Sequence, residues 1–472
     1  EPDKQVISGN PITRDITGEE YYSTLYSIRE SKISKGVIWT GSNDGIISIT
    51  KDGGKTWKNV TPKKLPKGGR VESVEPSQFN PAKAYIAVDR HLLGDETPYL
   101  YKTEDYGESW ELISTESNGI PSDYTARVLR EDPVREGLLY AGTEFGMFVS
   151  FDDGETWKKF QQNLPVTPIT DITLFRGDLI LSTMGRGFWI LDKVTTLQDE
   201  NITQLGDTPV LFRPDNTYRY QTPWGGGDFP EYPSTSVIID YYLPSDITEG
   251  VSLQIMDAQG KEVATIVSDS TKLKSTTEKV EDMSLSMTFV YMDEKLETKK
   301  GINRFEWNLQ QKGAWTKNKK RRYKNGPMVL PGKYTAKLTV GNESFEKPFE
   351  VLMDPRLEEE GVYLSDMKEQ QELQFKVIDL LSDARQLQDK VEEKIKELEK
   401  NNATESSLKQ YKEALKQLKN DEGAYPEVVM VAQISYLYYI LSGADKVPGQ
   451  EEKDSYQELL AKFNELKQKV VL

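Results

Sequence analysis

The sequence predicts a multidomain, mainly β protein: a partial β-propeller of about four blades, then a β-sandwich, then a C-terminal antiparallel α-helical bundle. Three observations predict this order. A short pattern, S/T-x-D-x-G-x-S/T-W, occurs three times at spacings of 53 and 47 residues, which is the period of successive four-stranded blades. Apolar and polar residues then alternate between residues 237 and 340, which predicts antiparallel strands. From residue 365 apolar residues recur at steps of three and four, which predicts amphipathic helices. We place the three domains at residues 1–196, 197–355 and 356–472.

The repeated pattern is a folding device. In a tight turn the Asp accepts hydrogen bonds from backbone amides, the Gly supplies a positive φ, and the Trp enters the seam beside the sheet. The residues with this structural role are Asp52, Gly54, Trp57, Asp105, Gly107, Trp110, Asp152, Gly154 and Trp157. The pattern resembles the Asp-box of sialidases, sortilins and related β-propellers, and the resemblance implies a structural role for these aspartates.

Short alternating segments around each copy predict the strands of the blades. Their residue ranges are 21–28, 37–42, 46–50 and 58–60 in the first blade; 71–74, 84–88, 100–103 and 111–114 in the second; 126–129, 138–142, 147–150 and 158–160 in the third; and 169–175, 179–183 and 188–191 in the fourth, which has no Asp-box.

Four blades raise the question of closure, because an open ring leaves unpaired sheet faces. We expect blades outside this chain to complete the ring, supplied by a missing N-terminal segment of a longer polypeptide or by another chain. The strand at residues 21–28 would pack against one of them. A self-contained four-bladed ring is the alternative.

Longer stretches carry a closer resemblance. Residues 10–22, 37–45, 99–107 and 185–192 look like the C-terminal half of large secreted bacterial proteins with sortilin-like BNR repeats, which are often labelled glycosyl hydrolases. The resemblance implies an extracytoplasmic bacterial protein (periplasmic, cell-surface or secreted), with a β-sandwich and a helical tail after the propeller.

Alternation and turn residues predict sandwich strands at residues 237–243, 251–257, 262–267, 302–309 and 334–340. Residues 255–261 and 301–307 resemble a FlgD-like, immunoglobulin-like module. Helices are predicted at about residues 365–400, 404–418, 426–441 and 452–470, with breaks at residues 401–402 and 442–443.

Composition excludes several classes of function. A net charge of −16 argues against nucleic acid as a partner. No apolar run has the length of a transmembrane segment, and no Cys occurs. The chain begins with Glu1 and not Met, which we interpret as a processed N-terminus. The single histidine, His91, excludes a histidine-rich metal centre, so we expect no cofactor, although the many acidic loops leave calcium open.

Blade topology selects one rim as the candidate ligand face. The Asp-box turns join the third and fourth strands, so the turns between the second and third strands lie on the opposite rim, with the segments that lead into each innermost strand. The candidate residues on this rim are Arg14, Asp15, Asp44, Asp89, Arg90, His91, Glu144 and Arg186.

Two functions remain open. The first is a sortilin-like binding or scaffolding protein that holds a protein, peptide or glycan partner within a larger envelope assembly. The second is a glycoside hydrolase with paired carboxylates on the propeller rim, with Asp44, Asp89 or Glu144 as one of them and the other supplied by the missing blades. No catalytic set can be assembled by motif: a Ser-His-Asp triad would have to use His91, and no Gly-x-Ser-x-Gly elbow or phosphate-binding loop is present.

Overall fold

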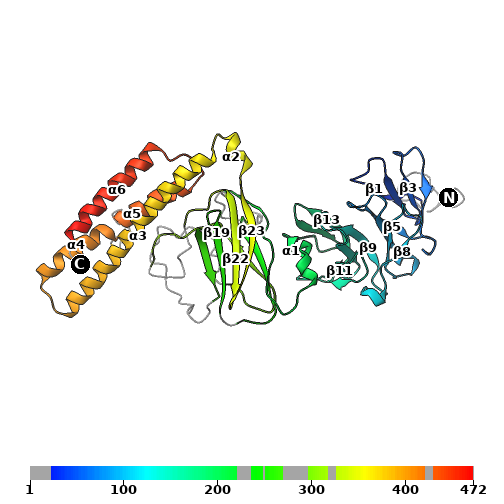
Figure 1. Cartoon of the computed structure of the whole chain (residues 1–472), viewed down its shortest axis with the longest axis horizontal. Helices are drawn as coiled ribbons and strands as arrows, with labels where there is room; N and C mark the ends of the chain where they lie inside the picture. Colours follow the sequence, from blue (N-terminus) through cyan, green and yellow to red (C-terminus); the bar gives the residue numbers. More distant parts are fainter. Residues whose placement is uncertain are drawn as a thin grey trace, which may run out of the picture. The chain divides into compact units, whose positions relative to one another are not determined.

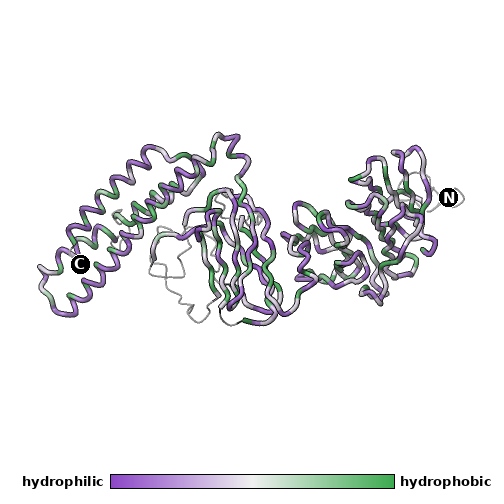
Figure 2. Tube along the Cα trace, viewed as in Figure 1, coloured by the Kyte–Doolittle hydropathy of each residue, from purple (hydrophilic) through white to green (hydrophobic). Residues whose placement is uncertain are grey.

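The structure is a computed structural model that describes residues 23–220, 235–247, 250–268, 296–316, 326–419 and 429–470. The chain forms two compact units, Glu1–Thr203 and Gln204–Leu472, and each is considered by itself (Figure 1). Along both units hydrophobic and hydrophilic residues alternate on the trace, as strands and helices with one buried face require (Figure 2). Within the described residues, no helix combines the length and the apolarity needed to cross a bilayer.

The first unit is built from four antiparallel sheets in chain order, which are the blades of a partial β-propeller. The strands of the first three sheets are β1 (Leu25–Glu30), β2 (Ile38–Ser42), β3 (Ile47–Thr50) and β4 (Lys58–Asn59); β5 (Arg70–Pro76), β6 (Ala84–Asp89), β7 (Tyr99–Thr103) and β8 (Glu111–Leu112); and β9 (Ala126–Glu131), β10 (Leu139–Thr143), β11 (Gly146–Ser150) and β12 (Lys158–Lys159). The fourth sheet has three strands, β13 (Ile169–Phe175), β14 (Asp178–Thr183) and β15 (Phe188–Leu191), and helix α1 (Thr195–Gln198) follows it.

Each predicted strand of the first unit overlaps an observed one, and the bounds differ by up to a few residues, as in β5, β8 and β9. Residues 21 and 22 of the first predicted strand lie outside the described residues. Strand β1 begins at Leu25, after Ser23, whose φ of 75° interrupts extended backbone.

All four innermost strands carry the same irregularity. Each pairs with its second strand in a register that shifts once, after Leu25 in β1, Val71 in β5, Ala126 in β9 and Ile169 in β13. These four residues are therefore equivalent, and so are the residues three places further on: Ile28, Val74, Leu129 and Ile172. The shared bulge lets positions in different blades be compared directly.

The equivalent residues pack against the second strand of the preceding blade. A Cβ added at Gly41 in β2 would lie 2.3 Å from Val71 Cγ1, and one at Gly142 in β10 would lie 2.7 Å from Ile169 Cγ2. Glycine at these positions lets the next blade approach closely. The equivalent position is Ala87 in the second blade and Ser182 in the fourth.

The second unit joins a β-sandwich to helices. One sheet has the order β16-β18-β21 and the other β17-β23-β22-β19-β20, with all pairs antiparallel except β17 and β23. The strands are β16 (Val210–Leu211), β17 (Thr217–Arg219), β18 (Val237–Leu243), β19 (Val251–Asp257), β20 (Glu262–Val267), β21 (Gly301–Trp307), β22 (Gly332–Val340) and β23 (Glu343–Met353). Both sheets contribute to one buried core that includes Tyr241 and Trp307.

The helices α2 (Pro355–Glu359), α3 (Leu364–Lys400), α4 (Glu405–Leu418), α5 (Met430–Ser442) and α6 (Gln450–Lys469) end the chain. Val377, Ala384 and Val391 follow one another at steps of seven residues, about two turns of α3, and are fully buried against α4, α5 and α6. This packing forms the helical bundle that the apolar spacing predicts.

Candidate functional site

The rim opposite the Asp-boxes holds the predicted ligand residues that the structure describes; Arg14 and Asp15 lie outside the described residues. Asp44 follows β2 and accepts hydrogen bonds from the hydroxyls of Ser42 and Ser23. Arg90 follows β6, forms an ion pair with Asp95 (2.8 Å), and donates to the backbone carbonyls of residues 66–68. Asp44 and Arg90 therefore fix their own loops, while Arg186 is exposed in the turn before β15.

The other three predicted residues meet around Arg127. We define the Arg127 cluster as Arg70, Glu72, Asp89, His91, Arg127 and Glu144. The Arg127 guanidinium lies 2.8 Å from Glu144 Oε2, 3.5 Å from Asp89 Oδ2 and 3.9 Å from Glu72 Oε1. Strands β5, β6 and β9 and the turn after β10 supply these groups, so the second and third blades build the cluster together.

The outer members of the cluster orient its carboxylates. Both Asp89 oxygens lie 2.7 Å from His91 Nδ1, and Asp89 also accepts a bond from the His91 backbone amide. Arg70 Nε donates to Glu72 at 2.8 Å and its guanidinium covers the ring of Tyr26, 4.8 Å from the centroid.

Burial is uneven across the cluster. Asp89, Glu72 and Arg127 are almost fully buried, whereas about a third of the side-chain surface of Arg70, Glu144 and His91 is exposed. Burial raises the pKa of the Glu72 carboxyl and outweighs the attraction of Arg70 and Arg127. The cluster is thus a compensated charge network with three accessible polar groups at its edge.

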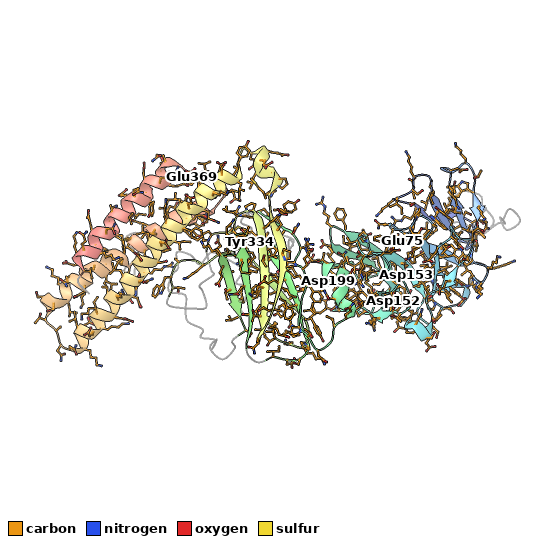
Figure 3. All side chains as sticks on the ribbon, in the orientation of Figure 1. Glu75, Asp152, Asp153, Asp199, Tyr334 and Glu369 are labelled. Atoms are coloured by element: carbon orange, nitrogen blue, oxygen red, sulfur yellow. The ribbon has the colours of Figure 1, made fainter. Side chains whose placement is uncertain are left out.

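A second ion-pair tier lies further along the innermost strands. Arg130 on β9 donates to Asp171 on β13 at 2.6 Å and lies 3.5 Å from Glu75 on β5, and Figure 3 labels Glu75 in this unit. Burial raises the pKa of Glu75. These ion pairs link three successive blades, so we interpret their role as structural.

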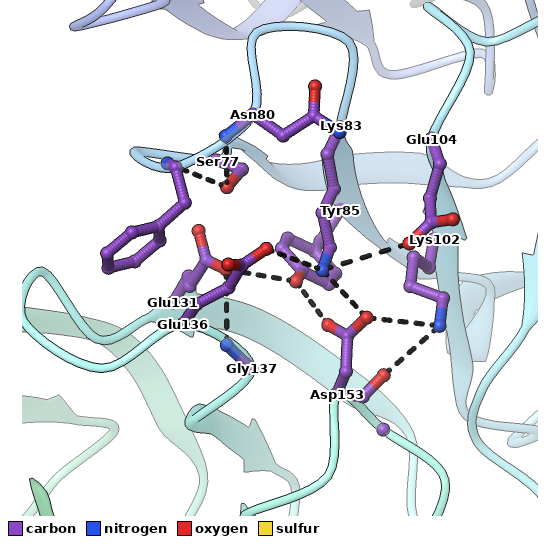
Figure 4. A network of polar contacts seen from close by, with 12 residues as sticks. Ser77, Asn80, Lys83, Tyr85, Lys102, Glu104, Glu131, Glu136, Gly137 and Asp153 are labelled. Atoms are coloured by element: carbon purple, nitrogen blue, oxygen red, sulfur yellow. Dashed lines mark hydrogen bonds and ion pairs between the residues drawn. The ribbon is translucent and has the colours of Figure 1, made fainter.

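A third polar network lies in the seam between the second and third blades (Figure 4). Tyr85, fully buried, donates to Glu131 Oε1 at 3.1 Å and to Asp153. Lys83 Nζ lies 2.7 Å and Lys102 Nζ 3.2 Å from Asp153 Oδ2. Burial raises the pKa of Glu131. These groups satisfy one another, so we interpret the network as a bridge between blades.

The carboxylate of each Asp-box accepts hydrogen bonds within its own turn. Asp52 accepts bonds from the Thr50 hydroxyl (2.8 Å), the Thr56 amide (2.9 Å) and the Thr56 hydroxyl (2.6 Å). Asp105 and Asp152 have the same three partners in their own boxes.

The boxes also connect successive blades. Trp110 Nε1 donates to the Val60 carbonyl of the first blade at 2.6 Å, and Trp157 Nε1 donates to the Ile113 carbonyl of the second at 2.7 Å. A Cβ at Gly107 would lie 2.7 Å from Val60, and one at Gly154 would lie 2.7 Å from Ile113. Each box after the first thus joins its blade to the residue that directly follows the outermost strand of the preceding blade, Val60 after β4 and Ile113 after β8.

The two end blades leave apolar faces exposed. Leu25 and Ile28 of β1 are 61% and 62% exposed, while all six equivalent residues of the other blades are buried. On the fourth blade, Phe188 and Ile190 of β15 are 80% and 59% exposed. Their equivalents by strand register, Ile47 and Ile49 in the first blade and Met147 and Val149 in the third, are buried.

Arg70, Glu72 and Arg127 were not among the predicted residues. They lie inside strands whose alternation shows which residues share a face but not which face lines the axis of the ring. Glu72 and Arg127 lie within the predicted innermost strands and Arg70 directly precedes one. Charged residues at such positions indicate partners across the blades, because burial of a charge without a partner is costly.

No group of three or more His, Cys, Asp or Glu side chains within the described ranges has a geometry suited to a metal ion. A cavity of about 350 Å³ lies on the Asp-box side of the third blade, lined by Arg135, Phe151, Asp152 and Lys158 among others. The cavity and the Arg127 cluster lie at opposite rims of the third blade, so they are separate features.

No protein-family model and no curated protein matches the sequence. Among solved structures the chain is similar to YCF48 bound to a D1 peptide (20% identity, TM-score 0.28, covering 36% of this chain and 51% of that one). It is also similar to the GH74 enzyme of Niastella koreensis, with 13% identity and a TM-score of 0.30, over 69% of this chain and 45% of that one. A third similar structure is the extracellular domain of the putative hybrid two component system BT3049 from B. thetaiotaomicron, with 11% identity and a TM-score of 0.28, over 71% of this chain and 40% of that one. The chain spans about half the length of the first of these. Similarities of this size say nothing about ligand or activity.

Proposed function

We propose that this chain belongs to an extracytoplasmic binding or scaffolding protein, whose propeller rim holds a protein, peptide or glycan partner and whose ring is completed by blades outside the chain. The observation that supports a binding role is the state of the rim carboxylates. Asp44 is bound by two hydroxyls, Asp89 by His91 and Arg127, and Glu144 by Arg127. A general acid or nucleophile has to be free to act on the substrate, whereas Asp89 is almost fully buried and Asp44 and Glu144 are each held by groups of their own fold.

The exposed edge of the Arg127 cluster suits recognition. Arg70, Glu144 and His91 present a donor, an acceptor and a ring beside one another, each with surface open to solvent and each held in place by a buried partner. Groups held in one geometry lose little entropy when a partner binds. The partner expected here is a polar one that pairs with both signs of charge.

The test is a binding screen of the full chain against peptide and glycan arrays at low salt. Glu144→Gln and Arg70→Gln should each weaken the strongest hits by about threefold to tenfold, because several rim contacts share the binding energy. Glu155→Gln, an exposed acid in the Asp-box turn of the third blade, is the control and should bind normally. Hits that are indifferent to both rim variants would contradict this site.

One observation favours the glycoside hydrolase as second candidate. Glu72 and Asp89 both lie within 4 Å of the same Arg127 nitrogen, so two carboxylates are close together, and burial raises the pKa of Glu72 as it would for a general acid. Arg127 occupies the space between them, where a sugar or water would have to enter. Glycan cleavage by the full chain that Glu72→Gln abolishes, with binding retained, would establish the hydrolase.

A further inference from the structure

The interfaces between blades repeat one set of contacts. The same set can be looked for on the exposed face of the first blade. At an interior interface the first-strand pair, such as Val71 and Val74, is buried against the preceding blade. The box Trp donates to the carbonyl of the residue that directly follows the outermost strand of the preceding blade, and the box Gly faces the side chain of that same residue. Both boxed interfaces, first to second and second to third, show all three contacts.

The first blade has the same groups, and no blade precedes it among the residues that the structure describes. Leu25 and Ile28 are more than half exposed, and Trp57 is 47% exposed, whereas Trp157 is buried. A Cβ at Gly54 would meet only the ring of Trp57, while Gly107 and Gly154 each face a residue of another blade. The first blade therefore has all three parts of an interior interface, the first-strand pair, the box Trp and the box Gly, and each of them lacks the contact that it makes at an interior interface.

We propose that Leu25, Ile28, Gly54 and Trp57, here called the blade 1 face, form the docking surface for a complete four-stranded blade outside the described residues. This inference rests on the proposed function, of which it specifies one partner. The chemistry of the occupant follows from the interior interfaces. It presents a small residue to Leu25, as Gly41 does to Val71, and an apolar residue at the end of its fourth strand to Gly54, as Val60 and Ile113 do. The carbonyl of that apolar residue accepts the Trp57 indole N–H.

A second copy of this chain does not meet these requirements. Besides the blade 1 face itself, the exposed blade end that its described residues offer is the fourth blade, which has the order β13-β14-β15 and no fourth strand among residues 169–203. After β15 the chain enters α1, and Leu197 of α1 packs into the core between the third and fourth blades. The fourth blade offers the apolar surface of Phe188 and Ile190 but not the outermost strand that Trp57 needs. The occupant is therefore a different blade.

The position of the contact can be stated in sequence terms. Val60 and Ile113, which accept the indole bonds, each lie three residues after the Trp of their own Asp-box. The residue that meets Trp57 should likewise lie about three residues after a box Trp, or at the end of a fourth strand where no box precedes it.

The experiment replaces Trp57 with the photo-crosslinking residue p-benzoylphenylalanine in the cells that naturally make the protein. The control variant carries the same residue in place of Leu92. Leu92 is an exposed residue of the rim insert, away from the box turns. Irradiation should give a crosslinked product from position 57 whose peptide contains a propeller strand with the stated spacing. The control position should give no such product.

A second variant carries p-benzoylphenylalanine in place of Leu25. Crosslinks from position 57 to Phe188 or Ile190 would identify the fourth blade, of the same chain or of a second copy, as the occupant and would overturn the proposal. The absence of a product from both position 57 and position 25 in folded protein would overturn it as well. The second position guards against loss of the Trp57 side chain itself. Failure here is distinguishable from failure of the ligand proposal, because Glu144→Gln alters array binding and leaves this crosslink unchanged.

Discussion

Each Asp-box carboxylate is held by the hydroxyl two residues before it and by the amide and hydroxyl four residues after it, so the box is a closed set of short-range bonds. Hydrogen bonds from the Thr56 side chain and backbone, and from Thr50, lower the pKa of Asp52 to about 2. In Asp105 and Asp152 burial opposes ionisation, yet the bonds from Ser109 and Thr156 prevail and lower the pKa of both.

Thr56→Val should raise the pKa of Asp52 towards the ordinary value of about 3.9, because it removes the strongest of these bonds. Since the folded pKa is depressed, ionised Asp52 stabilises the fold above pH 4 and this contribution is lost as the pH falls towards 2. The variant should therefore unfold at a higher pH than the parent on acidification. Carboxyl NMR titration measures the pKa, and Asp105 and Asp152 serve as internal controls that should not move.

Asp105→Ala should destabilise the fold by about 1–2 kcal/mol, because the Ser109 amide loses its acceptor at a partly exposed turn. Asp105→Asn, which keeps one oxygen, should cost less. Urea denaturation measures both. Array binding should be unchanged in either variant, and a folded Asp105→Ala protein of normal stability that fails to bind would give the box a role in recognition.

Residue types alone could not separate the charged residues that stabilise their own loops from those that join the Arg127 cluster. Asp44, Arg90 and Glu144 are all polar residues near rim turns, yet only Glu144 joins the Arg127 cluster, while Arg90 spends its donors on backbone carbonyls of residues 66–68. The distinction depends on contacts between residues 17 and 55 positions apart in sequence, Arg127 with Glu144 inside the third blade and Arg127 with Glu72 across two blades, and no local pattern contains them.

At the scale of the element, the box tryptophans should differ in energy according to whether a blade precedes them. Trp157→Ala should cost about 3–5 kcal/mol in the chain alone, since a buried ring and its bond to the Ile113 carbonyl are lost. Trp57→Ala should cost less than about 1 kcal/mol, as for an exposed residue. Chemical denaturation of the two variants gives the comparison; equal costs would mean that Trp57 is already packed.

The seam network around Tyr85 predicts a pH effect. Burial raises the folded pKa of Glu131, so its stabilising contribution is complete below the unfolded value of about 4.3 and is lost as the pH rises through the folded pKa. Glu131→Gln cannot ionise, and its stability relative to the parent should therefore rise between pH 4 and pH 7. Denaturation at both pH values checks the sign.

Tyr85→Phe is the companion variant, because it removes the one hydroxyl that both Glu131 and Asp153 accept from. It should cost about 1–3 kcal/mol, the penalty of leaving buried acceptors without their donor. A neutral result would mean that Lys83 and Lys102 satisfy Asp153 without help, and that the hydroxyl adds little to the seam.

Strand and helix positions followed from the sequence wherever burial is one-sided, as in β18 and β19, whose bounds match the predicted ones. Strand β23 was not predicted: it contains Pro348 and four acidic or basic residues and half of it faces solvent, so its alternation is weak. Parallel pairing of β17 with β23 joins segments more than 130 residues apart, and no local period encodes such a pair.

At the scale of the whole molecule, the sandwich and the helices act as one unit because polar bonds join them. Gln371 on α3 donates to the Met328 carbonyl at 2.7 Å, and the Trp315 amide donates to the Ser382 hydroxyl of α3 at 2.9 Å. Arg219 on β17 pairs with Asp445, after α5, at 2.6 Å, and both side chains are almost fully buried. Arg219 Nε and Asp445 Oδ1 have no further partner within the described part of the chain.

This ion pair predicts how the second unit unfolds. Asp445→Asn should cost about 3–5 kcal/mol, because it leaves the buried Arg219 charge uncompensated. The double variant Arg219→Met with Asp445→Leu removes both charges and should recover most of that loss. Glu346→Gln, which breaks an exposed pair with Lys337 on the sandwich, is the control and should cost less than about 1 kcal/mol. In calorimetry the transition of the sandwich should separate from that of the helices only in Asp445→Asn; a single unchanged transition in that variant would show that apolar packing, and not the buried pair, couples the two parts.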